Sequence, residues 1–490
     1  MKQTLLPLLA ACAMCACTAT PEASDYAVVA GPGIADDPQW NSVVEALCES
    51  HPGARVIHYR DTVSEALPAL REAAPRYVAF VEQPEQVGRT YIIALNRMSR
   101  EVDDDIYADY LWGVITGYDA EAALRMVRDA REPLVIRSAV STLREVGSGK
   151  WFDSFAYVDD RNAGICGEKK PGADSVSHYR TERLLEDGRP DLLRSFCDFY
   201  AAYDPDLITT ASHATERNLE MPFSVGNLRA RDGALYADFP EGPEALKESG
   251  KRRVFLPIGN CLIGNVNNTR ESMAIAWMNS AHASAMAGYV VPTWYGRNGW
   301  GGLKYWLTTP GRYSLAEAFY LNQQDMLHQI DSWDPELCRK PFPYGPDGFA
   351  EEDLEKASEV AGRELTIDEL GFFFDRDVLA FYGDPAWNVR LKELPEENDF
   401  TVTANTEGGQ YVLTVTTSEN FSAERMAGSH FKEEHVKDLP FSYFFPERLK
   451  NPRLAEGETW DAAVDENFLL IYNPGFEPGR SYTIRIDTDK

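Results

Sequence analysis

The fold is decided by two stretches, Asp206-Leu-Ile-Thr-Thr-Ala-Ser-His213-Ala214 and Arg253-Val-Phe-Leu-Pro-Ile-Gly-Asn260-Cys261. Each is a short apolar run that ends in a reactive side chain, a histidine in the first and a cysteine in the second. Short apolar runs of this kind are typical of buried strands in a parallel sheet. Open α/β sheets bind ligands at the carboxyl ends of such strands. We therefore expect His213 and Cys261 to lie together at one edge of a sheet.

The spacing of this pair favours thiol chemistry. Cys261 follows His213 by 48 residues, enough for one strand-loop-helix excursion and the return, and caspase-type cysteine peptidases place their histidine about 50 residues before the cysteine. A thiol attacks a carbonyl as the thiolate, so it needs a base and donors for the developing oxyanion. We expect the backbone N–H groups of Cys261 and Ala214 to be these donors. Glu216 either orients the histidine or is a solvated loop charge, and the second role is the commoner one.

The sequence after residue 24 divides into three blocks. Residues 25–146 alternate apolar runs with helical patterns, which predicts a parallel sheet with helices on both faces. The expected strands are Tyr26–Ala30, Arg55–Tyr59, Tyr77–Val81 and Leu134–Arg137, and the expected helices are Gln39–Ser50, Ser64–Ala73 and Ala120–Arg131.

The second block, residues 147–394, contains the two decisive runs and is the expected catalytic unit. Small residues recur over Glu271–Ala287, which predicts a long helix packed closely on the sheet. A strand is expected at Tyr289–Pro292. A glycine- and tryptophan-rich loop over 293–302 should follow it and emerge at the same edge as Cys261.

The third block, residues 395–490, has an all-β pattern. Phe400–Ala404 and Gln410–Thr416 alternate apolar and polar residues and flank Glu407-Gly-Gly, which indicates a hairpin. Further strands are expected at Phe468–Tyr472 and Ser481–Ile486. About ninety residues of this character predict a small immunoglobulin-like sandwich.

Composition and charge exclude several classes of function. The sequence has 490 residues, with 48 Lys and Arg against 77 Asp and Glu and a formal net charge of −29. This length predicts several domains, and the acidity argues against nucleic-acid binding because no basic stripe is available for phosphate contacts. Asp103–Asp105 lacks the alternating ligand spacing of a calcium loop, so a solvated acidic turn is expected there. We expect no cofactor and no metal.

The N-terminal residues have the pattern of an export signal. The apolar stretch Leu5–Ala16 is too short to span a bilayer as a helix. Cys12, at the end of Leu-Ala-Ala-Cys, resembles the lipidated cysteine of a bacterial lipobox, and Cys17 is the alternative. Residues 1–24 are therefore expected to be signal and tether. The mature chain should be an exported lipoprotein of the cell envelope, in the periplasm or at the cell surface.

Five cysteines remain beyond this segment, and their pattern favours free thiols. They are Cys48, Cys166, Cys197, Cys261 and Cys338. An odd number without paired spacing indicates neither a disulfide framework nor a zinc site. At least one of them is unpaired, and we expect it to be Cys261.

These motifs resemble those of the gingipain-like cysteine peptidases, which have a caspase-type fold. That family has one apolar strand ending in His-Gly and another ending in a small residue and cysteine, where this chain has Ser212-His213-Ala214 and Asn260-Cys261. Phe381-Tyr-Gly-Asp-Pro-Ala-Trp-Asn-Val-Arg-Leu391 resembles the segment that closes the family's catalytic region. The resemblance implies an α/β fold with a caspase-like parallel sheet flanked by helices in two adjacent units, followed by the sandwich. Ala214 replaces the family's glycine, which costs about 1 kcal/mol if the position needs a positive φ.

The resemblance also implies that the loop after Tyr289–Pro292 forms a wall of the substrate pocket. Its expected substrate-binding residues are Trp294, Tyr295, Arg297 and Trp300. Core packing is the alternative role for the aromatic side chains, and pairing with a carboxylate is the alternative for the arginine.

The sequence thus predicts an exported, lipid-anchored cysteine endopeptidase that acts on proteins or peptides. A catalytically silent surface lipoprotein of the same family that binds peptide or glycan is the alternative, since a cysteine after an apolar strand is more often an inert hydrophobe. A periplasmic solute-binding lipoprotein would share the signal and the α/β blocks but would not explain the histidine–cysteine pair. A serine hydrolase is disfavoured because the sequence has no G-x-S-x-G elbow.

Overall fold

The computed structural model describes residues 25–345, 350–395, 399–431 and 436–489. The predicted signal segment and its two candidate lipidation sites, Cys12 and Cys17, lie outside the described residues. Within those ranges, every helix is too short or too polar to cross a bilayer.

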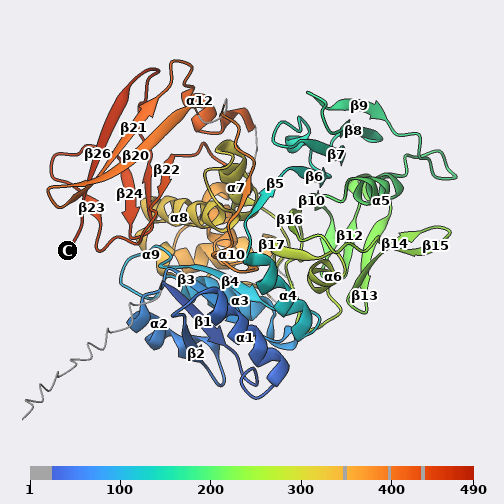
Figure 1. The fold of residues 1–490 in the computed structure, drawn as a ribbon, viewed down its shortest axis with the longest axis horizontal. Coiled ribbons are helices and arrows are strands. Elements are labelled where there is room, and N and C mark those ends of the chain that lie inside the picture. The colour runs from blue at the N-terminus through green and yellow to red at the C-terminus, as the bar shows by residue number, and fades with distance from the viewer. Residues whose placement is uncertain (1–24, 346–349, 396–398, 432–435, 490) are drawn as a thin grey trace, which may run out of the picture.

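A mixed sheet of twelve strands forms the centre of the α/β part (Figure 1). In sheet order its strands are β2 (Arg55–His58), β1 (Tyr26–Ala30), β3 (Tyr77–Val81), β4 (Leu111–Ile115), β18 (Leu379–Tyr382), β17 (Ala283–Tyr289), β16 (Arg253–Asn260), β10 (Leu207–Ser212), β6 (Ser138–Ser141), β7 (Ser154–Val158), β8 (Ile165–Lys169) and β9 (Ser177–Arg180). The pairs are parallel from β2 to β18 and from β17 to β7. The pairs β17–β18, β7–β8 and β8–β9 are antiparallel. The predicted α/β class is confirmed, but the sheet is mixed where a parallel one was expected.

Helices pack against this sheet and against one another. In chain order they are α1 (Pro38–Ser50), α2 (Leu67–Ala73), α3 (Arg89–Met98), α4 (Ala120–Ala130), α5 (Leu192–Tyr203), α6 (Met273–Asn279), α7 (Arg297–Thr308), α8 (Leu315–Trp333), α9 (Pro335–Arg339), α10 (Ala350–Ala361) and α11 (Ile367–Asp375). The longest, α8, begins with a capping box: the Ser314 hydroxyl accepts from the Glu317 N–H, and the Glu317 carboxylate accepts from the Ser314 N–H at 2.7 Å. Such a box pairs two N–H groups that have no partner inside the helix.

The two α/β blocks share the sheet across the predicted boundary at residue 146. β6 comes from the first block, yet it lies between β10 and β7 of the second. β18 comes from the second block and pairs with β4 of the first. The sheet is therefore one continuous layer to which both blocks contribute, and its two parallel halves meet at the antiparallel pair β17–β18.

The segment between β10 and β16 differs from the helical excursion expected there. It forms a five-stranded antiparallel meander of β11 (Ala214–Thr215), β12 (Asn218–Glu220), β13 (Asn227–Arg231), β14 (Ala234–Phe239) and β15 (Gly242–Ala245). β11 begins one residue after His213 and is an edge strand of this second sheet.

The alanine-rich segment is not one long helix. α6 ends at Asn279, His282 has a φ of 56°, and the chain continues as the fully buried β17. Small residues are needed there for packing: a Cβ on Gly288 would lie 2.9 Å from Pro257 Cγ and 3.2 Å from Gly264 Cα. Burial in the middle of the sheet thus overrides the helical propensity of alanine.

The predicted glycine- and tryptophan-rich loop becomes helix from Arg297 onward, because its glycines allow α7 to approach α8. A Cβ on Gly301 would lie 1.9 Å from Asn322 Oδ1, and one on Gly302 would lie 2.5 Å from the Phe319 ring. Every residue of α7 is buried. The glycines therefore serve helix packing.

We expect Gly301→Ala to destabilise the protein by about 1–3 kcal/mol, the usual cost of overpacking. The sign of this change in unfolding free energy tests the packing. Alanine is by itself the better helix former by about 1 kcal/mol, so without the close contact the substitution would stabilise the protein. Asn322 cannot easily move away, since its buried amide donates to the Asn298 carbonyl at 3.1 Å. Urea unfolding measures the change. Gly250→Ala is the control, because nothing lies within 4 Å of its Cβ position; equal stability of Gly301→Ala and wild type would contradict the packing.

The C-terminal block is a sandwich of two antiparallel sheets (Figure 1). One has the order β20 (Phe400–Glu407), β21 (Gln410–Thr417), β26 (Ser481–Asp487), β23 (Arg453–Leu454), and the other has the order β22 (Phe441–Phe444), β25 (Phe468–Ile471), β24 (Ala462–Asp465). Constant-type immunoglobulin domains pair strands A, B, E and D against C, F and G. Here the fifth and seventh strands, β24 and β26, have exchanged sheets. The two-sheet arrangement matches the prediction, and the immunoglobulin strand order does not.

The three-stranded sheet of the sandwich is buried on both faces. Leu469 and Ile471 belong to the core that it shares with the four-stranded sheet, whereas Phe468 and Leu470 belong to the main α/β core. Tyr320 of α8 contacts the Phe468 ring at 6.1 Å between centroids. The sandwich is therefore packed onto the α/β part.

Candidate functional site

The two decisive strands lie side by side in the sheet. β10 and β16 run parallel, and Ser212 is level with Asn260. His213 and Cys261 are the next residues of their strands, so they emerge at the same edge. The His213 side chain is exposed and Cys261 is half-buried.

An irregularity in β16 sets this register. Thr209 pairs with Leu256, but Ala211 pairs with Gly259, so β16 has one extra residue between these pairs. Without it, Ser212 would face Gly259 and the cysteine would lie one position further on than the histidine. The bulge includes Pro257, which has no N–H to donate to a neighbouring strand.

A buried polar network fixes the two strand ends to each other. The Asn260 side chain is fully buried and donates to the Ser212 carbonyl at 2.9 Å and to its hydroxyl at 3.0 Å. Its Oδ1 accepts from the Thr210 hydroxyl at 2.5 Å. Hydrogen-bonded amides of this kind keep a buried position in one geometry. Asn260 therefore holds the residue before the cysteine against the residue before the histidine.

The Cys261 sulfur accepts a hydrogen bond from the Thr293 N–H at 3.2 Å. The Thr293 hydroxyl also donates to the Asn260 carbonyl at 3.1 Å. Leu262, directly after the cysteine, has a left-handed φ of 60°, a conformation that costs a non-glycine residue about 1 kcal/mol or more. The cysteine thus lies on a sharp turn with an N–H pointing at its sulfur. Thr293 was not among the predicted site residues.

Ala214 lies in β11 with its N–H directed to an open edge. The Glu220 N–H donates to the His213 carbonyl at 3.0 Å, which makes that pair hydrogen-bonded. The next pair, Ala214 and Leu219, is then non-hydrogen-bonded, so their N–H groups point away from each other. β11 has no strand on its other side within the described meander. Ala214 is part of an extended strand, so its place needs no glycine.

Glu216 lies close to the site without orienting the histidine. Among the hydrogen bonds of the described residues, its carboxylate accepts from the Asn267 amide at 3.4 Å, and its carbonyl accepts from the Met273 N–H at 2.7 Å. It therefore ties the turn after β11 to the start of α6.

The four residues predicted to bind substrate have different surroundings. Trp294, next to Thr293, is 47% exposed, and Tyr295 packs edge-on against Phe374 at 5.5 Å between ring centroids. Arg297 is buried and pairs with Asp368 at 2.6 Å. Trp300 is 7% exposed. Arg297 and Trp300 are thus buried, and Trp294 is the most accessible of the four; their role in binding substrate stays a prediction.

The five cysteines of the described chain are all free thiols. Burial raises the pKa of Cys166 to about 11 and of Cys197 to about 12, and it also raises the pKa of Cys48 and Cys338. These four thiols are therefore held protonated at neutral pH, which makes them poor nucleophiles.

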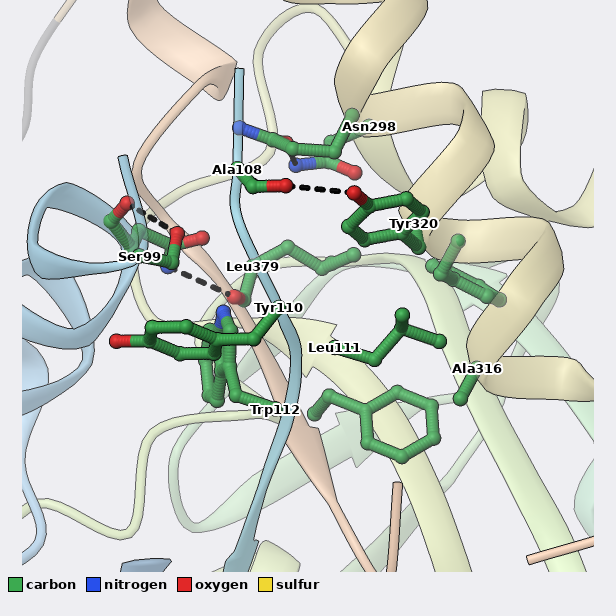
Figure 2. Close-up of a pocket in the computed structure, with 13 residues that line it drawn as sticks. Ser99, Ala108, Tyr110, Leu111, Trp112, Asn298, Ala316, Tyr320 and Leu379 are labelled. Atoms are coloured by element: carbon green, nitrogen blue, oxygen red, sulfur yellow. Dashed lines mark hydrogen bonds between the residues drawn. The ribbon is translucent and has the colours of Figure 1, made fainter. Parts of the chain in front are cut away.

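An apolar pocket lies elsewhere, between β4, β18 and α8 (Figure 2). It is lined by Leu111, Trp112, Tyr320 and Leu379, among others, and neither His213 nor Cys261 contributes to its wall. The Tyr320 hydroxyl at its rim donates to the Ala108 carbonyl at 2.6 Å. We assign this space to imperfect packing between helix and sheet.

Solved protease structures align with nearly the whole chain. The arginine-specific cysteine proteinase gingipain R has a TM-score of 0.37 and 10% sequence identity, over 96% of this chain and 93% of that one. The complex of the pro- and mature domains of RgpB from Porphyromonas gingivalis has a TM-score of 0.35 and 10% identity, over 95% and 93%. A structure described as a protease has a TM-score of 0.36 and 9% identity, over 95% and 97%. No family model and no curated protein sequence matches the chain.

Proposed function

We propose that this protein is a cysteine endopeptidase in which Cys261 is the nucleophile and His213 the base. The observation that carries the proposal is the register of β10 and β16, in which the residues before the pair are level and hydrogen-bonded. The Thr293 N–H supports it as well, because its hydrogen bond to the Cys261 sulfur at 3.2 Å holds the sulfur in place at the strand end. The register of β11 and β12, which turns the Ala214 N–H outward one residue after the histidine, also supports the proposal.

In the first half of the reaction, His213 accepts the proton of the Cys261 thiol and the thiolate attacks the peptide carbonyl carbon. The N–H groups of Cys261 and Ala214 hold the oxygen that becomes negative. The C–N bond then breaks, and His213 gives its proton to the leaving amine.

The second half of the reaction releases the acyl group. The thioester on Cys261 is hydrolysed by water, from which His213 accepts a proton. The C–S bond breaks, the acid product leaves, and the thiolate takes the proton back from His213. The enzyme returns to its starting state without a cofactor.

Substrates in this proposal are proteins or peptides outside the cytoplasm. Trp294 directly follows Thr293, whose N–H donates to the Cys261 sulfur, and its side chain is 47% exposed. It therefore offers substrate an aromatic surface next to the nucleophile. The pairing of Arg297 with Asp368 removes the cation that would have favoured acidic side chains. The lipobox-like Cys12 or Cys17 would tether the enzyme to the membrane.

Labelling with an irreversible peptidyl probe that carries a thiol-directed group tests the proposal. We expect rapid modification at neutral pH, confined to Cys261 by peptide mass mapping and lost in Cys261→Ala. Cys197→Ala is the matched control: this thiol is also half-buried, but its raised pKa keeps it protonated, so the variant should label like wild type. Slow labelling spread over several cysteines would favour a silent protein that binds peptide or glycan.

A further inference from the structure

The strand pairing that follows His213 places one acidic side chain beside the histidine. β11 and β12 form a hairpin in which Ala214 pairs with Leu219. The next pair in this register is His213 with Glu220, and the Glu220 N–H donates to the His213 carbonyl at 3.0 Å. The residues of a hydrogen-bonded antiparallel pair have Cα atoms about 5.5 Å apart and side chains on the same face. The Glu220 side chain therefore begins directly beside the imidazole.

Burial shows that the face shared by this pair points away from the protein core. Leu219 is fully buried in the main core, and Ala214 packs against that core. Because side chains alternate along a strand, His213 and Glu220 extend from the opposite face. There His213 is exposed and Glu220 is half-buried. A carboxylate and an imidazole placed in this way can meet through a change of rotamer alone.

The backbone of Glu220 belongs to the polar network that holds the site together. Its carbonyl accepts from the Ser212 hydroxyl, which in turn accepts from the Asn260 amide at 3.0 Å. Asn260 directly precedes Cys261. The same network therefore fixes Glu220 relative to the nucleophile as well as to the histidine.

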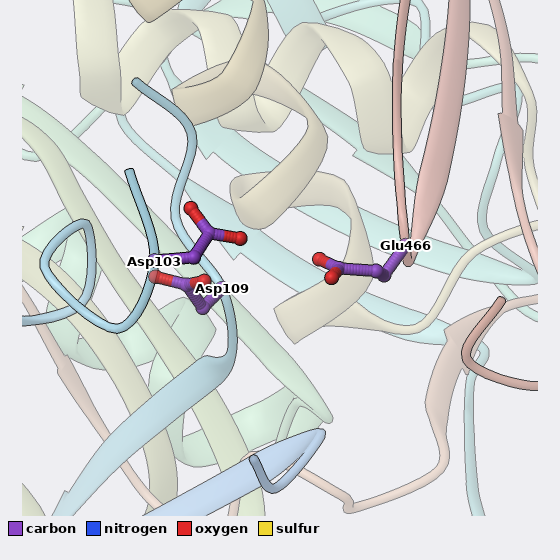
Figure 3. A group of neighbouring side chains, drawn as sticks. All are labelled: Asp103, Asp109 and Glu466. Atoms are coloured by element: carbon purple, nitrogen blue, oxygen red, sulfur yellow. The ribbon is translucent and has the colours of Figure 1, made fainter. Parts of the chain in front are cut away.

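The Glu220 carboxylate has no other role in the described residues. It takes part in no hydrogen bond or ion pair there, and neither does the His213 imidazole. With 77 Asp and Glu residues in the chain, a glutamate near a histidine could arise by chance. Acidic side chains elsewhere face one another, as Asp103 and Asp109 face Glu466 where the sandwich meets the α/β part (Figure 3). Glu220 faces a base instead.

The other charged groups around the hairpin are engaged or turned to solvent. The Glu216 carboxylate accepts at 3.4 Å from an amide of the loop that follows the nucleophile. Arg229, on the next strand of the meander, pairs with Asp238 at 2.7 Å. Arg217, in the turn of the hairpin, is exposed. The imidazole is therefore the available partner of the half-buried carboxylate.

We propose that Glu220 is the positioning residue of His213, an inference that rests on the peptidase function proposed above. Its carboxylate accepts a hydrogen bond from the imidazole N–H that does not face Cys261. Nucleophile–base pairs are commonly oriented by a third group of this kind, and such contacts often tighten only when substrate binds. The contact keeps the ring in one tautomer and stabilises the imidazolium that forms when the thiol gives it a proton. Glu220 thus takes the role that the sequence offered to Glu216.

Titration of the histidine ring protons by NMR in the full-length protein tests this contact, with His213→Ala assigning the resonance. We expect the midpoint of the His213 titration to fall by about one pH unit in Glu220→Gln, because the substitution removes a negative charge that favours the imidazolium. At a pH below the plateau of its rate, labelling of Cys261 by the peptidyl probe should slow by about tenfold. Glu220→Asp, which keeps the charge on the same face, should retain the wild-type midpoint.

Glu216→Gln is the matched control, since Glu216 is the neighbouring acid of the hairpin and its carboxylate is held by another loop. It should leave the His213 titration as in wild type. An equal fall in Glu216→Gln and Glu220→Gln would show only the field of an acidic surface and would overturn the positioning role. The same midpoint in wild type and Glu220→Gln would overturn it as well.

The two measurements separate this inference from the peptidase proposal. The NMR titration does not depend on the reactivity of the thiol. Slow labelling of Cys261 in wild type would count against the peptidase, and the midpoint in Glu220→Gln would still decide whether the contact exists. Rapid labelling that is lost in His213→Ala but unchanged in Glu220→Gln would support the peptidase and exclude Glu220 as the group that positions its base.

Discussion

Replacing His213 by alanine should slow the modification of Cys261 by a peptidyl probe, and peptide hydrolysis with it, by about 10²–10⁴-fold, the usual contribution of a general base. The variant keeps β10, the bulge in β16 and the Asn260 network, because none of these uses the imidazole. It removes only the group that takes the thiol proton. Attack by the thiolate then depends on hydroxide, so the remaining rate should rise steadily with pH.

The rate of inactivation measured from pH 5 to pH 10 separates this prediction from a structural effect. The inactivation rate of wild type should reach its plateau at a lower pH than that of His213→Ala. The rates of the two proteins should become more similar as the pH rises. His58→Ala is the control, since His58 is exposed on β2 at the far end of the sheet. Equal rates for His213→Ala and wild type would exclude His213 as the base, and a silent binding protein would then explain the fold better.

The elements that depend on local pattern could be predicted from the sequence. β1 and β3 have the predicted bounds, because continuous apolar runs of five residues suit strands covered on both faces. The hairpin between β20 and β21 is confirmed as well. Gly408 and Gly409, with φ of 62° and 91°, supply the two positive angles that a type I′ turn requires.

The elements that depend on distant contacts were missed. β17 has the composition of a helix, and only its place between β16 and β18 makes it a strand. α7 contains three glycines that would weaken an isolated helix, and its packing on α8 is what they permit. The exchange of β24 and β26 between the sheets of the sandwich could not be predicted either, because the alternation of apolar and polar residues in a strand is the same in either sheet.

The candidate site was predictable to the extent that it lies at strand ends. The two apolar runs predicted that His213 and Cys261 lie at strand ends. No local pattern predicted that β10 and β16 would be neighbours in this register. Pro257 was the available signal for the bulge, since proline inside a strand marks an irregular position. Thr293 could not be found, because its role depends on a backbone N–H.

We expect the largest effect on stability from a substitution in the buried ion cluster beside β18, where the two halves of the sheet meet. Asp377, fully buried just before β18, pairs with Arg376 at 2.8 Å and with Arg100 at 2.8 Å. Arg376 in turn donates to the carbonyls of Cys338 and Lys340, each at 2.8 Å. We expect Asp377→Asn to cost about 3–5 kcal/mol of unfolding free energy, because it leaves two buried guanidinium groups without their counter-charge.

The pH dependence of that loss identifies its cause. Burial alone would raise the pKa of Asp377, but the charges of Arg100 and Arg376 outweigh it and hold the pKa well below its usual range. A carboxyl with a lowered folded-state pKa stabilises the protein above its unfolded pKa, about 3.9 for aspartate, and that stability is lost as the pH falls toward the folded value. The difference in unfolding free energy between wild type and Asp377→Asn, measured by urea unfolding, should therefore be constant from pH 5 to pH 7 and become smaller below pH 4.

Asp238→Asn is the matched control for the charge itself. Asp238 pairs with Arg229 at 2.7 Å, but both side chains are about 40% exposed, so solvent replaces the lost partner. Its cost should stay below about 1 kcal/mol. If Asp377→Asn were as mild, the guanidinium groups of Arg100 and Arg376 would have to be satisfied by the carbonyls around them. The ion pair would then set the geometry at the start of β18 without supplying its stability, as happens where the desolvation of two buried charges cancels their attraction.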